Sequence, residues 1–227
     1  MTSETKIRKV AKLLRKAYGA PRPRRTPPVD ELVRTILSQN TSDRNSVPAF
    51  RAMKRRFGSW EMVLKAPVSS IAAVIVHAGL ANIKSARIVN VLRQIKEREG
   101  RISLARLNKG RAEDGLEYLK SLEGVGPKTA ACVLLFSFGK PVMPVDTHIF
   151  RVAKRTGIIP EDVTVEKAHG MLTRIVPKDL IYELHLGIIS HGRGTCRASS
   201  PKCGSCLLYR VCGFKMKDFY RKEAPCR

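Results

Sequence analysis

Long apolar runs are missing from this sequence of 227 residues. No stretch approaches the roughly 18 consecutive apolar residues that mark a membrane-spanning helix. The first ten residues, MTSETKIRKV, contain no apolar core of a secretory signal peptide. We therefore expect a cytoplasmic protein that makes no membrane contact.

Acidic residues are scarce: 19 Asp and Glu stand against 43 Lys and Arg, which leaves a formal net charge of +24 at pH 7. Such an excess of positive charge repels itself unless an anionic partner is bound, and nucleic acid is the commonest partner of this kind. A highly charged surface adapted to heat would normally add acidic and basic residues together. The charge therefore predicts a nucleic-acid-binding protein, which in the cytoplasm would be associated with the nucleoid.

Cysteines are few as well, six in the chain, too few for a disulfide scaffold. Four of them lie in TCRASSPKCGSCLLYRVCGF with the spacing C-x6-C-x2-C-x5-C, as Cys196, Cys203, Cys206 and Cys212. Structural zinc usually uses two tight cysteine pairs, whereas this run has one tight pair with an outlying cysteine on each side. Successive loops of this kind can give each iron of a [4Fe–4S] cluster one thiolate. The spacing favours such a cluster, with zinc as the alternative and disulfides third.

Strand-like alternation is also missing, and apolar residues recur instead at helical spacing along the chain. One helix is expected from Ile7 to Tyr18, after which APRPRRTPP (20–28) cannot continue a helix and reads as a basic linker. About ten helices and no sheet follow from this pattern. The predicted fold class is all-α.

The segment LEGVGPKTA (122–130) lies between two apolar helices. Gly124 and Gly126 allow a positive φ and leave no side chain over the turn. Because the turn opens a helix, its free N–H groups face outward and can bind one phosphate of a DNA backbone. A plain helical hairpin is the alternative.

Lys128 and Asp146 are the candidate catalytic pair. A partly desolvated lysine at the start of an apolar helix can lose its proton and act as a nucleophile. A carboxylate facing it could stabilise the cationic transition state when a sugar–base bond breaks. Taken singly, Lys128 could only bind phosphate and Asp146 could only cap a helix.

Together these segments resemble the endonuclease III family of DNA glycosylases, which are helix–hairpin–helix enzymes with an iron–sulfur cluster. The likeness is carried by ILSQNTSD, LEGVGPKTA, VDTHIFRVAKRTG and HGRGTCRASSPKCGSC, and spans about residues 29–212. It implies two α-helical domains that flank a DNA cleft. One is a helical barrel (30–145) with the helix–hairpin–helix at about 115–137, and the other is a cluster domain (1–29 and 146–227) with the [4Fe–4S] loop at 196–212.

The resemblance also implies the chemistry. Lys128 matches the family's nucleophile and Asp146 its essential carboxylate. Relatives that only excise the base usually lack this lysine, so its presence implies a bifunctional glycosylase and AP lyase. The implied substrate is double-stranded DNA with an oxidised pyrimidine or an abasic site, bound by a monomer. The alternatives are a glycosylase for uracil or thymine mispaired with guanine, a non-catalytic DNA-binding protein, and a zinc-ribbon binder.

Gln39 or Asn40 is expected to fill the gap left by the flipped base, and Leu80 of GLANIK (79–84) to wedge the opposite strand. Glu123 replaces the usual proline of the hairpin, and Ala81 stands where an aromatic residue is common. Either departure could change the substrate preference. The full set of expected DNA contacts is Gln39, Asn40, Leu80, Asn82, Lys84, Leu122, Gly124, Val125, Gly126, Thr129, His148, Arg193, Arg197 and Lys202.

Overall fold

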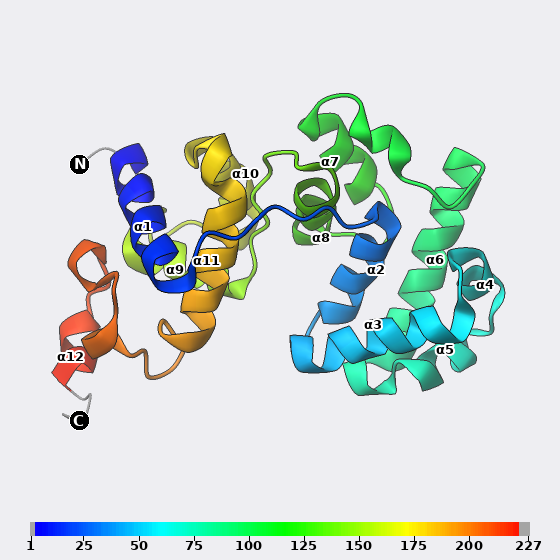
Figure 1. Cartoon of the computed structure of the whole chain (residues 1–227), viewed down its shortest axis with the longest axis horizontal. Helices are drawn as coiled ribbons and strands as arrows, with labels where there is room; N and C mark the ends of the chain where they lie inside the picture. The colour runs from blue at the N-terminus through cyan, green and yellow to red at the C-terminus, as the bar shows by residue number, and fades with distance from the viewer. Residues whose placement is uncertain (1–2, 223–227) are drawn as a thin grey trace. The chain divides into compact units, whose positions relative to one another are not determined.

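The computed structural model describes residues 3–222, and Cys226 lies outside this range. Within it the chain forms twelve α-helices and no β-strand, which confirms the all-α prediction (Figure 1). None of these helices is both long enough and apolar enough to cross a membrane. The helices are α1 (Ser3–Tyr18), α2 (Pro28–Ser38), α3 (Asp43–Phe57), α4 (Trp60–Lys65), α5 (Val68–Val74), α6 (Ala81–Glu99), α7 (Ala112–Lys120), α8 (Pro127–Val133), α9 (Thr147–Thr156), α10 (Val165–Ile175), α11 (Ile181–Gly194) and α12 (Lys217–Lys222).

The chain divides into two compact units, residues 24–140 and residues 1–23 with 141–227. A hydrogen bond near each boundary attaches the chain to one of the units. The main-chain N–H of Thr26 donates to Phe136 O at 3.1 Å, which attaches the end of the proline-rich linker to the first unit. Met143 N donates to Thr173 Oγ1 at 3.0 Å, which attaches the segment before α9 to the second.

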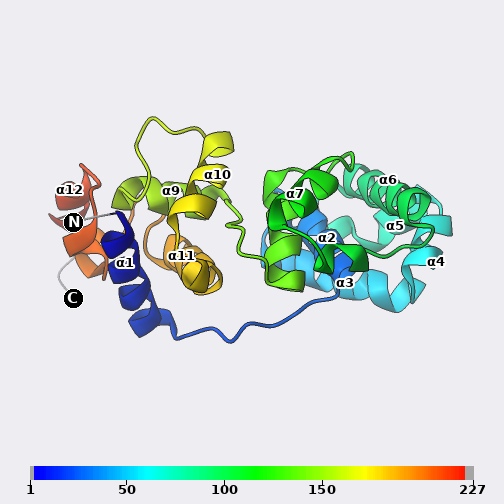
Figure 2. The same cartoon turned by 90° about the horizontal axis from the view of Figure 1, so that it is seen from above.

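The unit of residues 24–140 is built around α2, which contacts α3, α6 and α8. Pro28 occupies the first position of this helix. Proline is well suited to this position because an N–H there would have no acceptor within the helix. Leu32, Ile36 and Leu37 are fully buried, as expected for a helix with neighbours on several sides. α6 lies along α5 and buries one apolar face (Figure 2).

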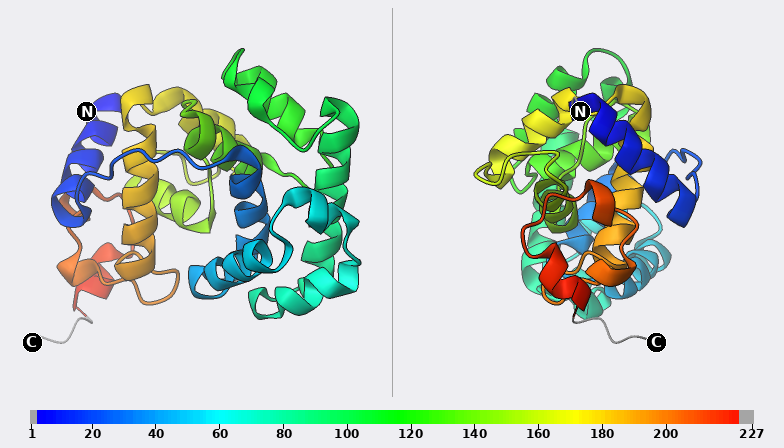
Figure 3. Two further views of the ribbon diagram at one scale, coloured as in Figure 1. Left: turned by 45° about the vertical axis from the view of Figure 1, so that its right-hand side comes forward. Right: turned by 90° about the vertical axis from the view of Figure 1, so that its left-hand side faces the viewer.

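In the other unit α11 packs against both α1 and α9 (Figure 3). Ile7, Val10 and Leu14 of α1 are buried, at the helical spacing seen in the sequence. The approach to α11 is close, because a Cβ on Gly187 would lie 3.1 Å from Leu14 Cβ. This packing joins the N-terminal helix to the C-terminal half of the chain.

Candidate active site and cysteine pocket

The predicted hairpin is present, with α7 and α8 joined by residues 121–126. Gly124 has φ +89°, so this position requires the left-handed region. Gly126 has φ −86° and ψ 174°, which any residue adopts, so the expected positive φ is wrong there. Leu122 and Val125, both expected to contact DNA, are buried, and Val125 N donates to Leu122 O at 3.0 Å, so their side chains are not available to DNA.

Four residues along one side of α6 hold the hairpin, and sequence reasoning missed this contact. Arg87 lies against Gly124, where an added Cβ would be 2.7 Å from Arg87 Cγ. Asn90 Nδ2 donates to the Glu123 carboxylate at 2.9 Å. Gln94 Oε1 accepts a hydrogen bond from the main-chain N–H of Glu123, and Arg98 donates one to Ser121 Oγ. The spacing of three or four residues places these side chains in one row, and was the signal available in the sequence.

Lys128 lies in the first turn of α8 and is half-buried. Within the unit of residues 24–140 no hydrogen bond or ion pair occupies its Nζ. The next residue, Thr129, is buried and accepts a hydrogen bond from Gln39 Nε2 at 3.3 Å. Thr129 therefore supports the interior of the site, and its side chain does not face a DNA backbone.

The two candidates for the gap-filling residue differ in their surroundings. Gln39 is held on both sides, because its Oε1 accepts from Arg87 and its Nε2 donates to Thr129. Asn40 is exposed and has φ +53°, in the left-handed region. Of the two, only Asn40 has a side chain that is exposed and could contact DNA.

In the GLANIK segment two of the expected DNA contacts are exposed and one is buried. Leu80 is 51% exposed and has φ +52°, and Asn82 is exposed beside it. Lys84, expected at the DNA surface, is only 2% exposed. Its Nζ donates to Leu37 O and Ala78 O, each at 2.8 Å. Lys84 therefore cannot contact a phosphate, because its ammonium group is buried among carbonyl oxygens of its own unit.

Asp146 belongs to the other unit and caps α9, because its Oδ1 accepts from Ile149 N at 2.7 Å. His148, two residues on, lies within 3.1 Å of an Arg151 nitrogen. Burial lowers the pKa of His148, and the nearby cations Arg151 and Arg193 add to this effect against the opposing effect of Asp146. A neutral imidazole at pH 7 would add no positive charge to a DNA-binding surface. Arg193, by contrast, is an exposed cation.

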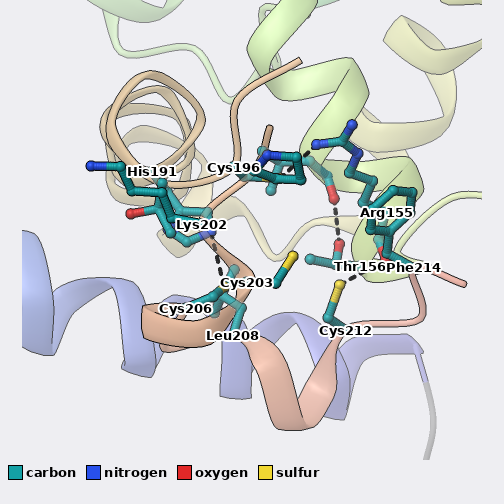
Figure 4. Close-up of a pocket in the computed structure, with 13 residues that line it drawn as sticks. Arg155, Thr156, His191, Cys196, Lys202, Cys203, Cys206, Leu208, Cys212 and Phe214 are labelled. Atoms are coloured by element: carbon teal, nitrogen blue, oxygen red, sulfur yellow. Dashed lines mark hydrogen bonds between the residues drawn. The ribbon is translucent and has the colours of Figure 1, made fainter. Parts of the chain in front are cut away.

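The four predicted ligand cysteines all line one pocket in the second unit (Figure 4). They are free thiols, so the disulfide alternative finds no support. Burial raises the pKa of the Cys206 thiol to about 11, and burial together with the neighbouring thiols also raises the pKa of Cys203 and of Cys212. Burial therefore disfavours the thiolate form of these three side chains. Within residues 3–222 no three side chains form a ready-made site for a single metal ion.

Arg155 organises the loop that contains the first two cysteines. Its guanidinium donates to Arg197 O at 2.6 Å and to Ala198 O at 2.9 Å, and it lies 3.5 Å from Cys196 Sγ. The side chains of Arg197 and Lys202 are exposed, as a role in phosphate binding requires. Arg155 thus contacts both the cysteine pocket and the main chain of the basic loop.

An all-α chain with a helix–hairpin–helix and a four-cysteine pocket defines a class of DNA repair protein. Residues 33–178 match the family described as HhH-GPD superfamily base excision DNA repair protein, and the chain belongs to this family.

The similar proteins confirm the resemblance to endonuclease III. Endonuclease III of Thermotoga maritima is 32% identical over 198 residues, which cover 87% of this chain and 86% of the relative. That of Escherichia coli is 33% identical over 190 residues, covering 84% and 85%. An Arabidopsis thaliana protein named as a DNA glycosylase is 38% identical over 165 residues, covering 73% of this chain but only 56% of the plant protein.

Two solved structures are similar over nearly the whole chain. A non-covalent endonuclease III–DNA complex gives a TM-score of 0.83 at 25% identity, covering 98% of this chain and 100% of that one. A trapped endonuclease III–DNA covalent intermediate gives 0.81 at 26% identity, covering 96% and 99%.

Proposed function

We propose that this protein is a bifunctional DNA glycosylase and AP lyase of base excision repair. It excises oxidised pyrimidines from double-stranded DNA and nicks the strand by β-elimination. The observation that carries the proposal is Lys128, a half-buried lysine without a partner in its unit, at the hairpin that the family uses. The similarity to a protein trapped as a covalent DNA intermediate supports a nucleophile of this kind.

The reaction begins when the damaged nucleotide leaves the stack, which costs least for a damaged or mispaired base. Lys128 Nζ attacks C1′ of the sugar, and the bond between C1′ and the base breaks with the electron pair leaving on the base. Loss of a proton from the nitrogen and opening of the sugar ring give a Schiff base. Removal of a C2′ proton then expels the 3′ phosphate, and water finally releases the lysine.

Asp146 supports this chemistry through its charge. Its cap to Ile149 N holds the carboxylate in one orientation while it stabilises the positive sugar and assists proton transfers. The unit of residues 24–140, which contains Lys128, would be the helical barrel. The other unit, which contains Asp146, would be the cluster domain.

Asn40, rather than Gln39, is our candidate to fill the gap left by the flipped nucleotide, because Gln39 is already bonded to Arg87 and Thr129. Leu80 would wedge the opposite strand with its exposed side chain. Exposed cations at Arg193, Arg197 and Lys202, together with main-chain N–H groups of the hairpin, would bind phosphates. The protein would act as a monomer in the cytoplasm, associated with the nucleoid.

The four cysteines would hold a [4Fe–4S] cluster. The residues fit this group, because four free thiols line one pocket whose walls include Val152, Leu208 and Phe214. When bound, the cluster would supply iron for the four cysteine thiolates to bind, which would hold the loop 196–212 in place without taking part in the reaction. Arg155 would lie beside it, where its cation offsets thiolate charge.

Borohydride trapping tests the proposal on duplexes that contain thymine glycol, dihydrouracil, uracil, a G·T mispair or an abasic site. The wild type should form a covalent adduct that Lys128→Ala does not form. Lys120 is an exposed lysine in the same hairpin. Lys120→Ala is therefore the matched control and should form the covalent adduct as the wild type does. The duplex that traps fastest identifies the substrate, so preference for uracil or the mispair would favour the mismatch alternative. Tight binding without an adduct on any duplex would refute the lyase.

A further inference from the structure

Lys84 is the most deeply buried charged side chain of the unit formed by residues 24–140, at 2% exposure. A buried ammonium group is costly unless polar partners replace water. Two carbonyl oxygens do so here, Leu37 O and Ala78 O, each 2.8 Å from Nζ. These two acceptors are 41 residues apart in the chain, so the lysine joins two segments that are distant in sequence.

Each carbonyl lies just before an exposed loop residue with unusual backbone geometry. Leu37 is in the last turn of α2, three residues before Asn40, whose φ is +53°. Ala78 ends a short 3₁₀ helix two residues before Leu80, whose φ is +52°. The left-handed conformation is unfavourable for an L-residue, so the surrounding structure must hold it.

Lys84 contacts the second loop a second time through its main chain. Its N–H donates to Leu80 O at 2.9 Å, at the first turn of α6. Lys84 therefore hydrogen-bonds to the last turn of α2, to the 3₁₀ helix that ends at Ala78, and to Leu80 itself. Sequence position alone could not indicate this, because Leu37 reaches Lys84 only through the packing of α2 beside α6.

We propose that Lys84 is a positioning residue that holds the loop of Asn40 and the loop of Leu80 in a single arrangement, so that both side chains enter the duplex together. This inference rests on the proposed function, which assigns gap filling and wedging to these two residues. Lys84 itself touches no DNA. Its contribution is to the extrusion of a paired base, whereas bond cleavage depends on Lys128 and Asp146.

The test separates extrusion from cleavage. Lys84→Met keeps the apolar stem and removes the donors. Single-turnover excision of dihydrouracil is compared with nicking at a preformed abasic site in the same duplex, where there is no base to unpair. Because a misplacement of about 1 Å can cost on the order of 100-fold, we expect excision to slow by about 10- to 100-fold and nicking by less than about 3-fold. An equal loss of both activities would overturn the proposal.

Two control variants come from the same helix. Ser85→Ala changes an adjacent, fully buried residue whose Oγ has no hydrogen-bond partner, and should leave the ratio of the two rates unchanged. Ile88→Ala creates a cavity in the core one helical turn further along α6. If Ile88→Ala alters the ratio as Lys84→Met does, the lysine serves general stability alone and the inference fails.

Hydrogen exchange gives a readout that does not depend on activity. In Lys84→Met, amides of residues 38–42 and 78–81 should exchange at least about 10-fold faster, with no such change in Ser85→Ala. Unchanged exchange in Lys84→Met would refute this inference. Failure of the wild type to excise any base would refute the proposed function, and the exchange experiment could still be read in that case. If Lys84→Met does not fold, Lys84→Gln is measured in the same way. Failure of both to fold while Ile88→Ala folds would assign Lys84 to the core alone.

Discussion

The two glycines of the hairpin should respond very differently to substitution by alanine. Gly124→Ala places a side chain at φ +89°, in the left-handed region that costs roughly 1–2 kcal/mol. The new Cβ would lie 2.7 Å from Arg87 Cγ and 2.9 Å from its Cδ, so Arg87 must move. Displacing a packed side chain costs about 1–3 kcal/mol. The sum is a destabilisation of about 2–5 kcal/mol.

Movement of Arg87 would also break its hydrogen bond to Gln39. At about 2–4 °C per kcal/mol for a chain of this size, the melting temperature of Gly124→Ala should fall by about 4–20 °C. Circular dichroism at the helix band measures this directly.

Gly126→Ala is the matched control in the same turn. No atom lies within 4 Å of its added Cβ, and its backbone is extended, so stability should change by less than about 0.5 kcal/mol. The Cβ would instead stand on the open side where we propose a DNA phosphate. Loss of one hydrogen bond to a charged group, about 1.5–3 kcal/mol, would weaken DNA binding by about 10- to 100-fold. Equal losses of melting temperature in the two variants would refute the reasoning.

Two further variants test the other unit. Asp146→Asn keeps an oxygen that can accept from Ile149 N, so the melting temperature should stay within about 4 °C while single-turnover excision falls by about 100-fold or more. A large loss of stability with a proportionate loss of activity would reduce Asp146 to a helix cap. Cys203→Ser removes one of the four thiols of the pocket, so bound iron and acid-labile sulfide, and with them DNA affinity, should fall. Zinc in place of iron and sulfide in the purified wild type would contradict the cluster.

Local pattern alone determined the all-α fold class, because apolar residues at helical spacing specify which face of each helix is buried. Ile7, Val10 and Leu14 share a stripe in the sequence and are buried in the structure. The cysteine spacing likewise indicated one shared site, since residues within a short loop cannot lie far apart. The hairpin of α7 and α8 was also visible in the sequence, from glycines between two apolar segments.

Tertiary structure alone decided which polar residues face outward. Lys84 has the sequence character of a surface cation, yet it is buried and its Nζ donates to Leu37 O, 47 residues earlier in the chain, and to Ala78 O. Gln39 and Asn40 are adjacent polar residues. They differ because Gln39 forms hydrogen bonds with Arg87 and Thr129, which belong to other helices. In each case the hydrogen-bond partner that determines exposure belongs to another helix. The sequence pattern of one segment does not show which other segment packs beside it in the folded chain.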